Sequence, residues 1–411
     1  MPDMDILLVL GVALVAGIAG QKIFKRFGIP QVVGGIVAGL LLGVSMEPYN
    51  LIDEKTIDAL TPIVLLALAF IGFNIGGELR ADVLRSLGKS VVAILLCESL
   101  FAFALVSLVS YLILRNTALG LVFGALAAAT APAATTDVIY EYRASGPLTI
   151  TLLAIVGLDD VVGLVLYGFV SGYVKASLLG LPLTIANTLL GPVKTIALSL
   201  LVGSAVGLAA ILPLKKATEK RDILIITLGS LLLVLGLSEM LDLSEILASM
   251  ATGIVITNVL HTRRTEVVFE GILEFSQPFL VVFFVLVGAR LQVRYLLIPS
   301  VVFLSLMYVG ARTAGKMSGS YLGAAVSGAP ESVKKYLGYA LFSQAGVAIG
   351  LAFAFYREFT ELGGHQGIEW GILVINVIAV TTLIVQLIGP PFVKYALVKA
   401  GEAKTVGPKK G

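Results

Sequence analysis

Residues 151–165 read Thr151-Leu-Leu-Ala-Ile-Val-Gly-Leu-Asp159-Asp160-Val-Val-Gly-Leu-Val165, which places two adjacent aspartates inside an apolar run. Apolar residues flank the pair for two helical turns on both sides, so a solvated loop does not explain it. Ionised groups at bilayer depth are costly unless they are paired or hydrated, and they are usually functional. The stretch therefore predicts a membrane-spanning helix whose two carboxylates carry chemistry.

The composition of the whole chain agrees with a membrane protein. Of 411 residues, 58% are hydrophobic and only 13% are charged, which excludes an ordinary soluble protein. Continuous runs rich in Leu, Ala, Gly and Val argue against a β-barrel, whose strands alternate polar and apolar residues. We predict an all-α polytopic membrane protein of about 13 transmembrane helices, at residues 4–20, 29–43, 57–76, 90–114, 118–139, 148–172, 193–214, 222–241, 243–260, 269–290, 296–323, 336–356 and 370–393.

The distribution of basic residues predicts the orientation. With the N-terminus outside, 20 Lys and Arg residues fall on one side of the membrane and seven on the other. Cytoplasmic loops carry the excess of basic residues. We therefore expect a multi-pass protein of the cell (plasma) membrane, in contact with the lipid bilayer, with an outer N-terminus and a cytoplasmic C-terminus.

Weak internal matches at one offset predict a repeat. Thr130 and Gln344, which both interrupt apolar runs, lie 214 residues apart, and so do Gly39 and Gly253. Within a single transporter domain over residues 1–411, we predict a first inverted repeat at 1–175, a connecting helix at 176–221, a second inverted repeat at 222–395 and a cytoplasmic tail at 396–411. Glycine also recurs in membrane helices for packing alone, which is the simpler alternative for any one match.

The fifth predicted span is interrupted by Pro132. Proline lacks a backbone donor and disfavours helix at the preceding residue, so carbonyls and helix ends become free there. Irregular backbone in a membrane is tolerated only where it faces protein or a cavity. Together with the hydroxyl of Thr130, the break indicates an ion site, although a plain proline kink is an alternative.

Other polar residues fall within the predicted spans. Arg312 needs a carboxylate partner, and Glu98, 214 residues earlier, is the other isolated intramembrane acid. We therefore predict an Arg312–Glu98 ion pair. Lys316 lies one turn from Arg312, and we interpret it as a side chain that extends toward the membrane surface. With Gln344 and Asn376, it forms a set of possible supporting residues.

A carboxylate beside a cavity can hold either a proton or a dehydrated monovalent cation. Competition for one anionic site is the simplest chemistry for exchanging the two ions. Asp160, Asp159 and Thr130 are the predicted ligands for Na+, with no cofactor and no nucleic-acid partner. The two histidines, His261 and His365, fall in separate loops and do not indicate a metal site.

The chain resembles the monovalent cation:proton antiporter superfamily, in particular its second branch of NapA-like and NHA-type sodium/proton antiporters. The resemblance covers essentially the whole chain and rests on residues 30–43, Phe70-Ile71-Gly72, Thr130-Ala-Pro132, Asp159-Asp160, Phe283-Phe284-Val-Leu-Val-Gly288 and Arg312-Thr-Ala-Gly-Lys316-Met-Ser-Gly319. It implies an NhaA/NapA-like fold with two crossed broken helices, a homodimer and elevator-like alternating access.

The resemblance also implies residue roles. Asp160 would carry the cation and the proton, with Asp159 and Thr130 assisting. Arg312 would take the place of the basic residue of a late helix, paired with Glu98 as in NHA-type members. Because arginine keeps its proton in proteins, such a site would exchange one Na+ (or Li+) for one H+, without net charge.

Two other functions remain open from the residues alone. One is potassium/proton antiport or Kef-like potassium efflux, since the geometry of the cation site is not visible in the sequence. The other is sodium-coupled symport of an organic anion. That function requires an anion ligand, which Arg312 supplies only if Glu98 does not neutralise it.

Overall fold

The computed structural model describes residues 6–27, 29–43, 51–81, 88–180, 190–292, 298–344 and 346–403. Within these ranges the regular structure is entirely helical, with no β-strand. The predicted all-α fold class is confirmed. The chain divides into two compact units, and each unit is assembled from two separate stretches of sequence.

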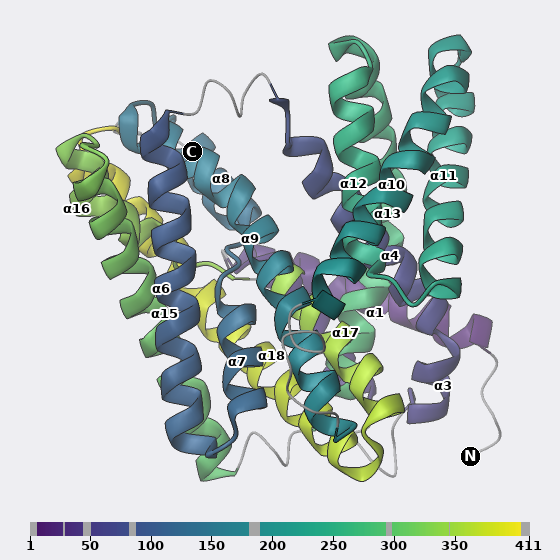
Figure 1. The fold of residues 1–411 in the computed structure, drawn as a ribbon, viewed down its shortest axis with the longest axis horizontal. Coiled ribbons are helices and arrows are strands. Elements are labelled where there is room, and N and C mark those ends of the chain that lie inside the picture. The colour runs from purple at the N-terminus through teal and green to yellow at the C-terminus, as the bar shows by residue number, and fades with distance from the viewer. Residues whose placement is uncertain are drawn as a thin grey trace. The chain divides into compact units, whose positions relative to one another are not determined.

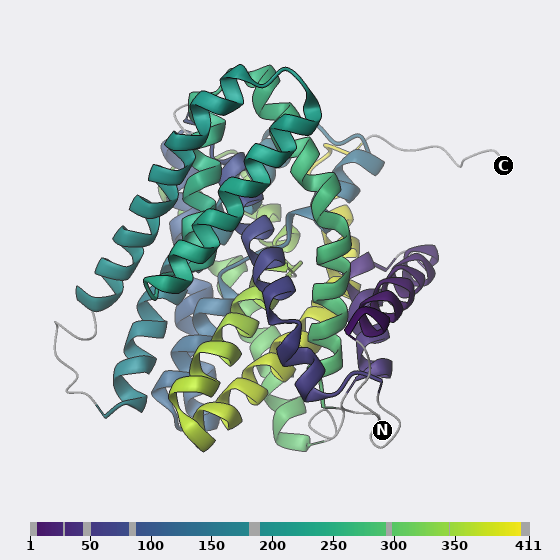
Figure 2. The ribbon, with the colours of Figure 1, turned by 90° about the vertical axis from the view of Figure 1, so that its right-hand side faces the viewer.

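Unit 1 comprises residues 1–85 and 181–293. Its helices are α1 (Ile6–Arg26), α2 (Gln31–Leu42), α3 (Glu54–Ala59), α4 (Thr61–Glu78), α10 (Gly191–Lys216), α11 (Lys220–Met240), α12 (Glu245–Val259) and α13 (Thr262–Arg290). In this unit α1 lies against α2 and α13 (Figure 2), and α12 lies between α4 and α10.

Unit 2 comprises residues 86–180 and 294–411. Its helices are α6 (Lys89–Leu114), α7 (Thr117–Ala127), α8 (Pro132–Glu141), α9 (Pro147–Leu178), α15 (Pro299–Val326), α16 (Glu331–Ala340), α17 (Gly346–Leu362) and α18 (Gly364–Lys399). Figure 1 shows α6 and α15 side by side, and α16 and α17 as two consecutive pieces.

Each predicted span overlaps one helix or two consecutive helices of the described chain. Eight of these helices are long and apolar enough to cross a membrane, namely α1, α4, α6, α9, α10, α11, α13 and α18. Shorter apolar helices are α2, α7 and α12, and α15 carries Arg312 and Lys316. The boundaries of the predicted inverted repeats stay a prediction, because the division into units follows a different partition of the chain.

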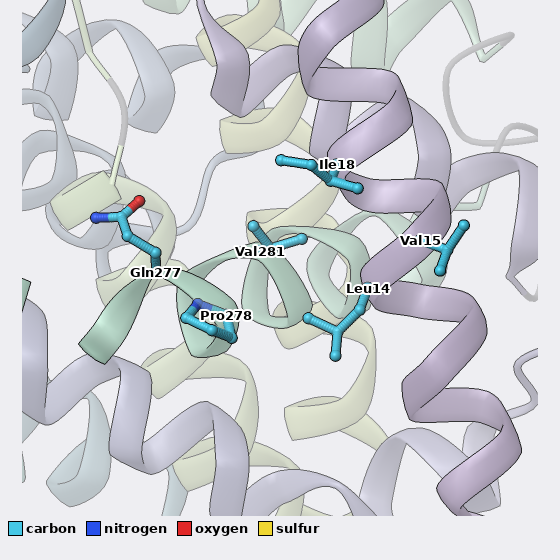
Figure 3. A pocket seen from close by; sticks show the side chains of 6 residues that line it. All are labelled: Leu14, Val15, Ile18, Gln277, Pro278 and Val281. Atoms are coloured by element: carbon cyan, nitrogen blue, oxygen red, sulfur yellow. The ribbon is translucent and has the colours of Figure 1, made fainter. Parts of the chain in front are cut away.

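An open apolar pocket of about 310 Å³ lies between α1 and α13 of unit 1. Figure 3 shows its lining, which α1 and α13 share: Leu14, Val15, Ile18, Gln277, Pro278 and Val281. None of these side chains is charged, so the pocket supplies no carboxylate for a cation. The candidate ion ligands belong to unit 2.

A line of glycines brings α6 and α15 into close contact in unit 2. Gly315, Gly319 and Gly323 are spaced by four residues and share one face of α15. A Cβ built on Gly319 would lie 2.6 Å from the Cα of Glu98, and one on Gly315 would lie 2.6 Å from the Cα of Ala102. Small residues at such spacing let membrane helices pack backbone to backbone. The glycines thereby hold Glu98 against α15.

This packing predicts a selective effect of adding one methyl group to α15. Gly319→Ala forces α6 and α15 apart, so we expect a melting temperature several degrees below that of the unchanged protein in detergent. Gly310→Ala is the matched control, because a Cβ at Gly310 on the same helix meets nothing within 4 Å. Equal melting temperatures for the two variants would contradict the packing role of Gly319.

Candidate ion site

The first element of the site is a break between α7 and α8. Helix α7 ends at Ala127, and α8 begins at Pro132 after Ala131 in an extended conformation (φ −73°, ψ 118°). Proline without an N–H and the restriction on the residue before it account for the break. The carbonyls of Ala127, Ala128 and Ala129 are therefore not satisfied by a continuing helix.

The second break lies between α16, which ends at Ala340, and α17, which begins at Gly346. The two breaks are bonded to each other. Ala131 N donates to Ser343 O at 3.0 Å, and Gln344 Nε2 donates to Leu126 O at 2.6 Å. The two interruptions predicted from the sequence thus meet in one place.

Arg312 of α15 lies where the two breaks meet, and is 1% exposed. Its guanidinium donates to five backbone carbonyls: Ala127 (3.1 Å), Ala129 (2.7 Å), Leu341 (3.3 Å), Phe342 (2.7 Å) and Ser343 (3.3 Å). Helix C-termini carry partial negative charge, and the flat five-donor fork of arginine can serve two such ends at once. Arg312 therefore joins the C-terminal ends of α7 and α16.

The predicted Arg312–Glu98 ion pair is wrong. Glu98 Oε2 lies 2.6 Å from Lys316 Nζ instead. Lys316 Nζ also donates to Asp159 Oδ2 at 3.0 Å and to the carbonyl of Ala128. The donors of Arg312 are used by carbonyls at two helix ends. The carboxylates of Glu98 and Asp159 therefore pair with Lys316, one turn further along α15.

The interpretation of Lys316 as a side chain that reaches the membrane surface is also wrong. The Lys316 side chain is 1% exposed, and both of its carboxylate partners are fully buried. A buried ammonium needs acceptors around it, because the protein must replace the water that it loses. Two carboxylates and one helix-end carbonyl meet that need.

The paired aspartates lie near the middle of α9, with Asp159 fully buried and Asp160 4% exposed. The Thr130 side chain is within interaction range of the Asp159 carboxylate. Even so, Asp159 Oδ1 and Thr130 Oγ1 have no well-oriented hydrogen-bond partner in the described part of the chain. Buried oxygens of this kind are normally satisfied by water or an ion. The arrangement suits a small cation.

Most of the chain matches a known family. Residues 10–396 match the model of the family described as sodium/hydrogen exchanger, transmembrane. The chain belongs to this family.

Two relatives of this exchanger are named as an antiporter, or a subunit of one, that exchanges a cation for a proton. It is 23% identical over 323 residues to the high-affinity Na+/H+ antiporter NhaS3 of Synechocystis, covering 71% of this chain and 69% of that protein. It is 26% identical over 292 residues to the ammonium/H+ antiporter subunit AmhT of Alkalihalophilus pseudofirmus, covering 69% of each. The family is a transporter family, not a class of enzymes.

A solved structure shares the fold of this exchanger. The sodium proton antiporter MjNhaP1 of Methanocaldococcus jannaschii superimposes with a TM-score of 0.76 at 20% identity, covering 96% of this chain and 98% of that chain. The resemblance stated from the sequence is confirmed at the level of the superfamily and the fold.

Gln344 and Asn376, two of the predicted supporting residues, differ in the partners of their side-chain amides. Gln344 Nε2 also contacts the hydroxyl of Tyr308 at 3.0 Å, and Gln386 Nε2 donates to the Gln344 carbonyl at 2.9 Å. Asn376 Nδ2 instead donates to Ile372 O within α18. Tyr308 and Gln386 were not expected from the sequence. A polar residue within an apolar span is the only signal they give.

Removing the fork of Arg312 should destabilise the exchanger. Arg312→Lys keeps the charge but leaves several buried carbonyls without a donor, each at a cost of about 1–3 kcal/mol. We expect a clearly lower melting temperature in detergent, whereas Arg263→Lys on the exposed surface of α13 should leave it unchanged. A fully stable Arg312→Lys protein would show that the carbonyls do not depend on the guanidinium.

Proposed function

We propose that this exchanger transports Na+ or Li+ against H+ by competition of the two ions for Asp160, with Asp159 and Thr130 as further ligands. The observation that supports it most directly is the buried cluster of oxygens beside two broken helices. Asp159 Oδ1 and Thr130 Oγ1 are left unsatisfied there among the described residues. Carboxylate and hydroxyl oxygens replace the water that a small hard cation loses. The name of the relative NhaS3 supports sodium as the cation.

Cation choice has a specific alternative. The relative AmhT is named as a subunit of an ammonium/H+ antiporter, and its identity to this chain is similar to that of NhaS3. Ammonium and K+ are larger than Na+, so they need a wider ring of oxygens. Potassium/proton antiport remains the related alternative. Symport of an organic anion loses its support, because Arg312 already serves five carbonyls.

The charges of the site favour electroneutral exchange. The ionised forms of Glu98, Asp159 and Asp160 supply three negative charges, and those of Arg312 and Lys316 supply two positive charges. One Na+ or one proton then balances the remaining negative charge. An uncompensated buried charge is strongly unfavourable, so the site favours holding one ion or the other.

Glu98 remains a counter-ion of Lys316 throughout the proposed cycle. When a cation draws Asp159 away from Lys316, the ammonium still has Glu98 at 2.6 Å, closer than Asp159 at 3.0 Å. Lys316 therefore stays paired whichever ion Asp159 meets, and one Na+ exchanges for one H+. Lys316, rather than Arg312 as the resemblance implied, is the basic residue bonded to Asp159.

The wider setting is proposed on the family resemblance and on the basic residues of the loops. We place this multi-pass protein in the plasma membrane as a homodimer, with its N-terminus outside, its C-terminus in the cytoplasm and elevator-like alternating access. The inverted repeats at 1–175 and 222–395 belong to the same proposal.

Asp160→Asn should abolish exchange, because the amide can hold neither the proton nor the charge that attracts a cation. The measurement is dissipation of a pH gradient in proteoliposomes on addition of Na+, Li+, K+ or NH4+. Asp222→Asn, at an exposed position on α11, is the control and should keep full activity. An active Asp160→Asn protein would remove Asp160 from the site, and a response to K+ or NH4+ without Na+ would reverse the cation choice.

Glu98→Gln should change the stoichiometry. Without the Glu98 charge, the site is neutral when empty and carries one positive charge when it holds a cation, so its movement should transfer net charge. We expect 22Na+ uptake driven by a membrane potential alone in the variant and none in the unchanged protein. Potential-driven uptake by the unchanged protein would disprove electroneutral exchange.

A further inference from the structure

Ser99 is a buried residue of α6 whose hydroxyl has an unusual partner. Other buried hydroxyls on the helices, such as those of Ser199, Thr227 and Ser305, donate to the carbonyl four residues earlier in their own helix. The Ser99 hydroxyl instead donates to Oε1 of the adjacent Glu98 at 2.7 Å. Ser99 is fully buried, so no solvent competes for this bond.

The bond holds one oxygen of Glu98 while the other oxygen faces Lys316. Ser99 holds Oε1, and Oε2 lies 2.6 Å from Lys316 Nζ. The close contact of Gly319 with the Glu98 backbone limits how far the carboxylate can move. Oε1 thus faces a hydroxyl donor, and Oε2 faces the ammonium of Lys316.

Lys316 is shared between Glu98 and Asp159, so whatever strengthens one contact weakens the other. A firmly held Glu98 anion draws the ammonium away from Asp159 and leaves more negative charge on Asp159 for a cation. Without the Ser99 hydroxyl, Oε1 becomes a buried acceptor with no donor, which favours rotation of the Glu98 carboxylate away from its present position. Lys316 would then move onto Asp159 and compete with the cation there.

We infer that Ser99 is a positioning residue for cation binding, which acts through Glu98 and Lys316 without touching the cation. The inference rests on the proposed exchange of a monovalent cation for a proton at Asp159 and Asp160. Ser99 thereby sets how strongly Na+ competes with Lys316 for Asp159.

The test compares two buried serines of the same helix. Ser110 is also fully buried on α6, but its hydroxyl has no hydrogen-bond partner in the described part of the chain. In proteoliposomes at one fixed pH, Ser99→Ala should raise the KM for Na+ by about fivefold or more, the effect of one lost hydrogen bond to a charged group. The maximal rate should stay within about twofold. Ser110→Ala should match the unchanged protein.

Two further variants separate positioning from general stability. Ser99→Cys keeps the size of the side chain but donates weakly, so its KM should lie between those of the unchanged protein and Ser99→Ala. Ser99→Thr keeps the hydroxyl and should restore the KM. In a Glu98→Gln background, adding Ser99→Ala should change the KM by less than about twofold, because neighbours that act through one group are not additive.

Each result decides the inference. It is overturned if Ser99→Ala and Ser99→Cys both have the KM of Ser110→Ala, or if Ser99→Ala acts fully in the Glu98→Gln background. A separate result, no cation-dependent exchange by the unchanged protein, would overturn the proposed function itself.

Discussion

Backbone carbonyls buried at two helix ends are the constraint on which unit 2 depends. The C-terminal ends of helices α7 and α16 lie close together. A membrane domain offers little water to bond the carbonyls that these ends leave free. Arg312 donates to five of these carbonyls, and Lys316 donates to the carbonyl of Ala128. The carbonyls at these helix ends thus need the donors of two buried cationic side chains, whether or not a transported ion is bound.

The carboxylates follow from those cations. Arg312 donates to carbonyls at the helix ends, whereas Lys316 faces Glu98 and Asp159. Breaking a buried ion pair by removing one partner is costly, so the three side chains depend on each other. This dependence couples the site to an arriving cation. A cation that binds Asp159 weakens the contact of Asp159 with Lys316, and this in turn alters the contact of Lys316 with Glu98.

Close helix packing sets the distances in this network. The glycines of α15 let the α6 backbone approach, and Gly319 touches the residues around Glu98. A larger residue there would collide with the Glu98 backbone and push α6, which carries Glu98, away from α15, which carries Lys316. Apolar packing and ion chemistry are therefore parts of one design in unit 2, while the apolar pocket of unit 1 contributes no charge.

Local sequence features are enough to predict the helical membrane fold, the two interruptions and the buried aspartate pair. These follow from local properties: long apolar runs, the missing N–H of Pro132, and the cost of burying Asp159 and Asp160. The tertiary structure decided which cation meets which carboxylate. Arg312 and Lys316 lie one turn apart on the same face of α15, so sequence spacing alone could not separate them. Only the positions of the two helix ends, brought together by distant segments, assign the carbonyls to Arg312 and leave Lys316 to Glu98 and Asp159.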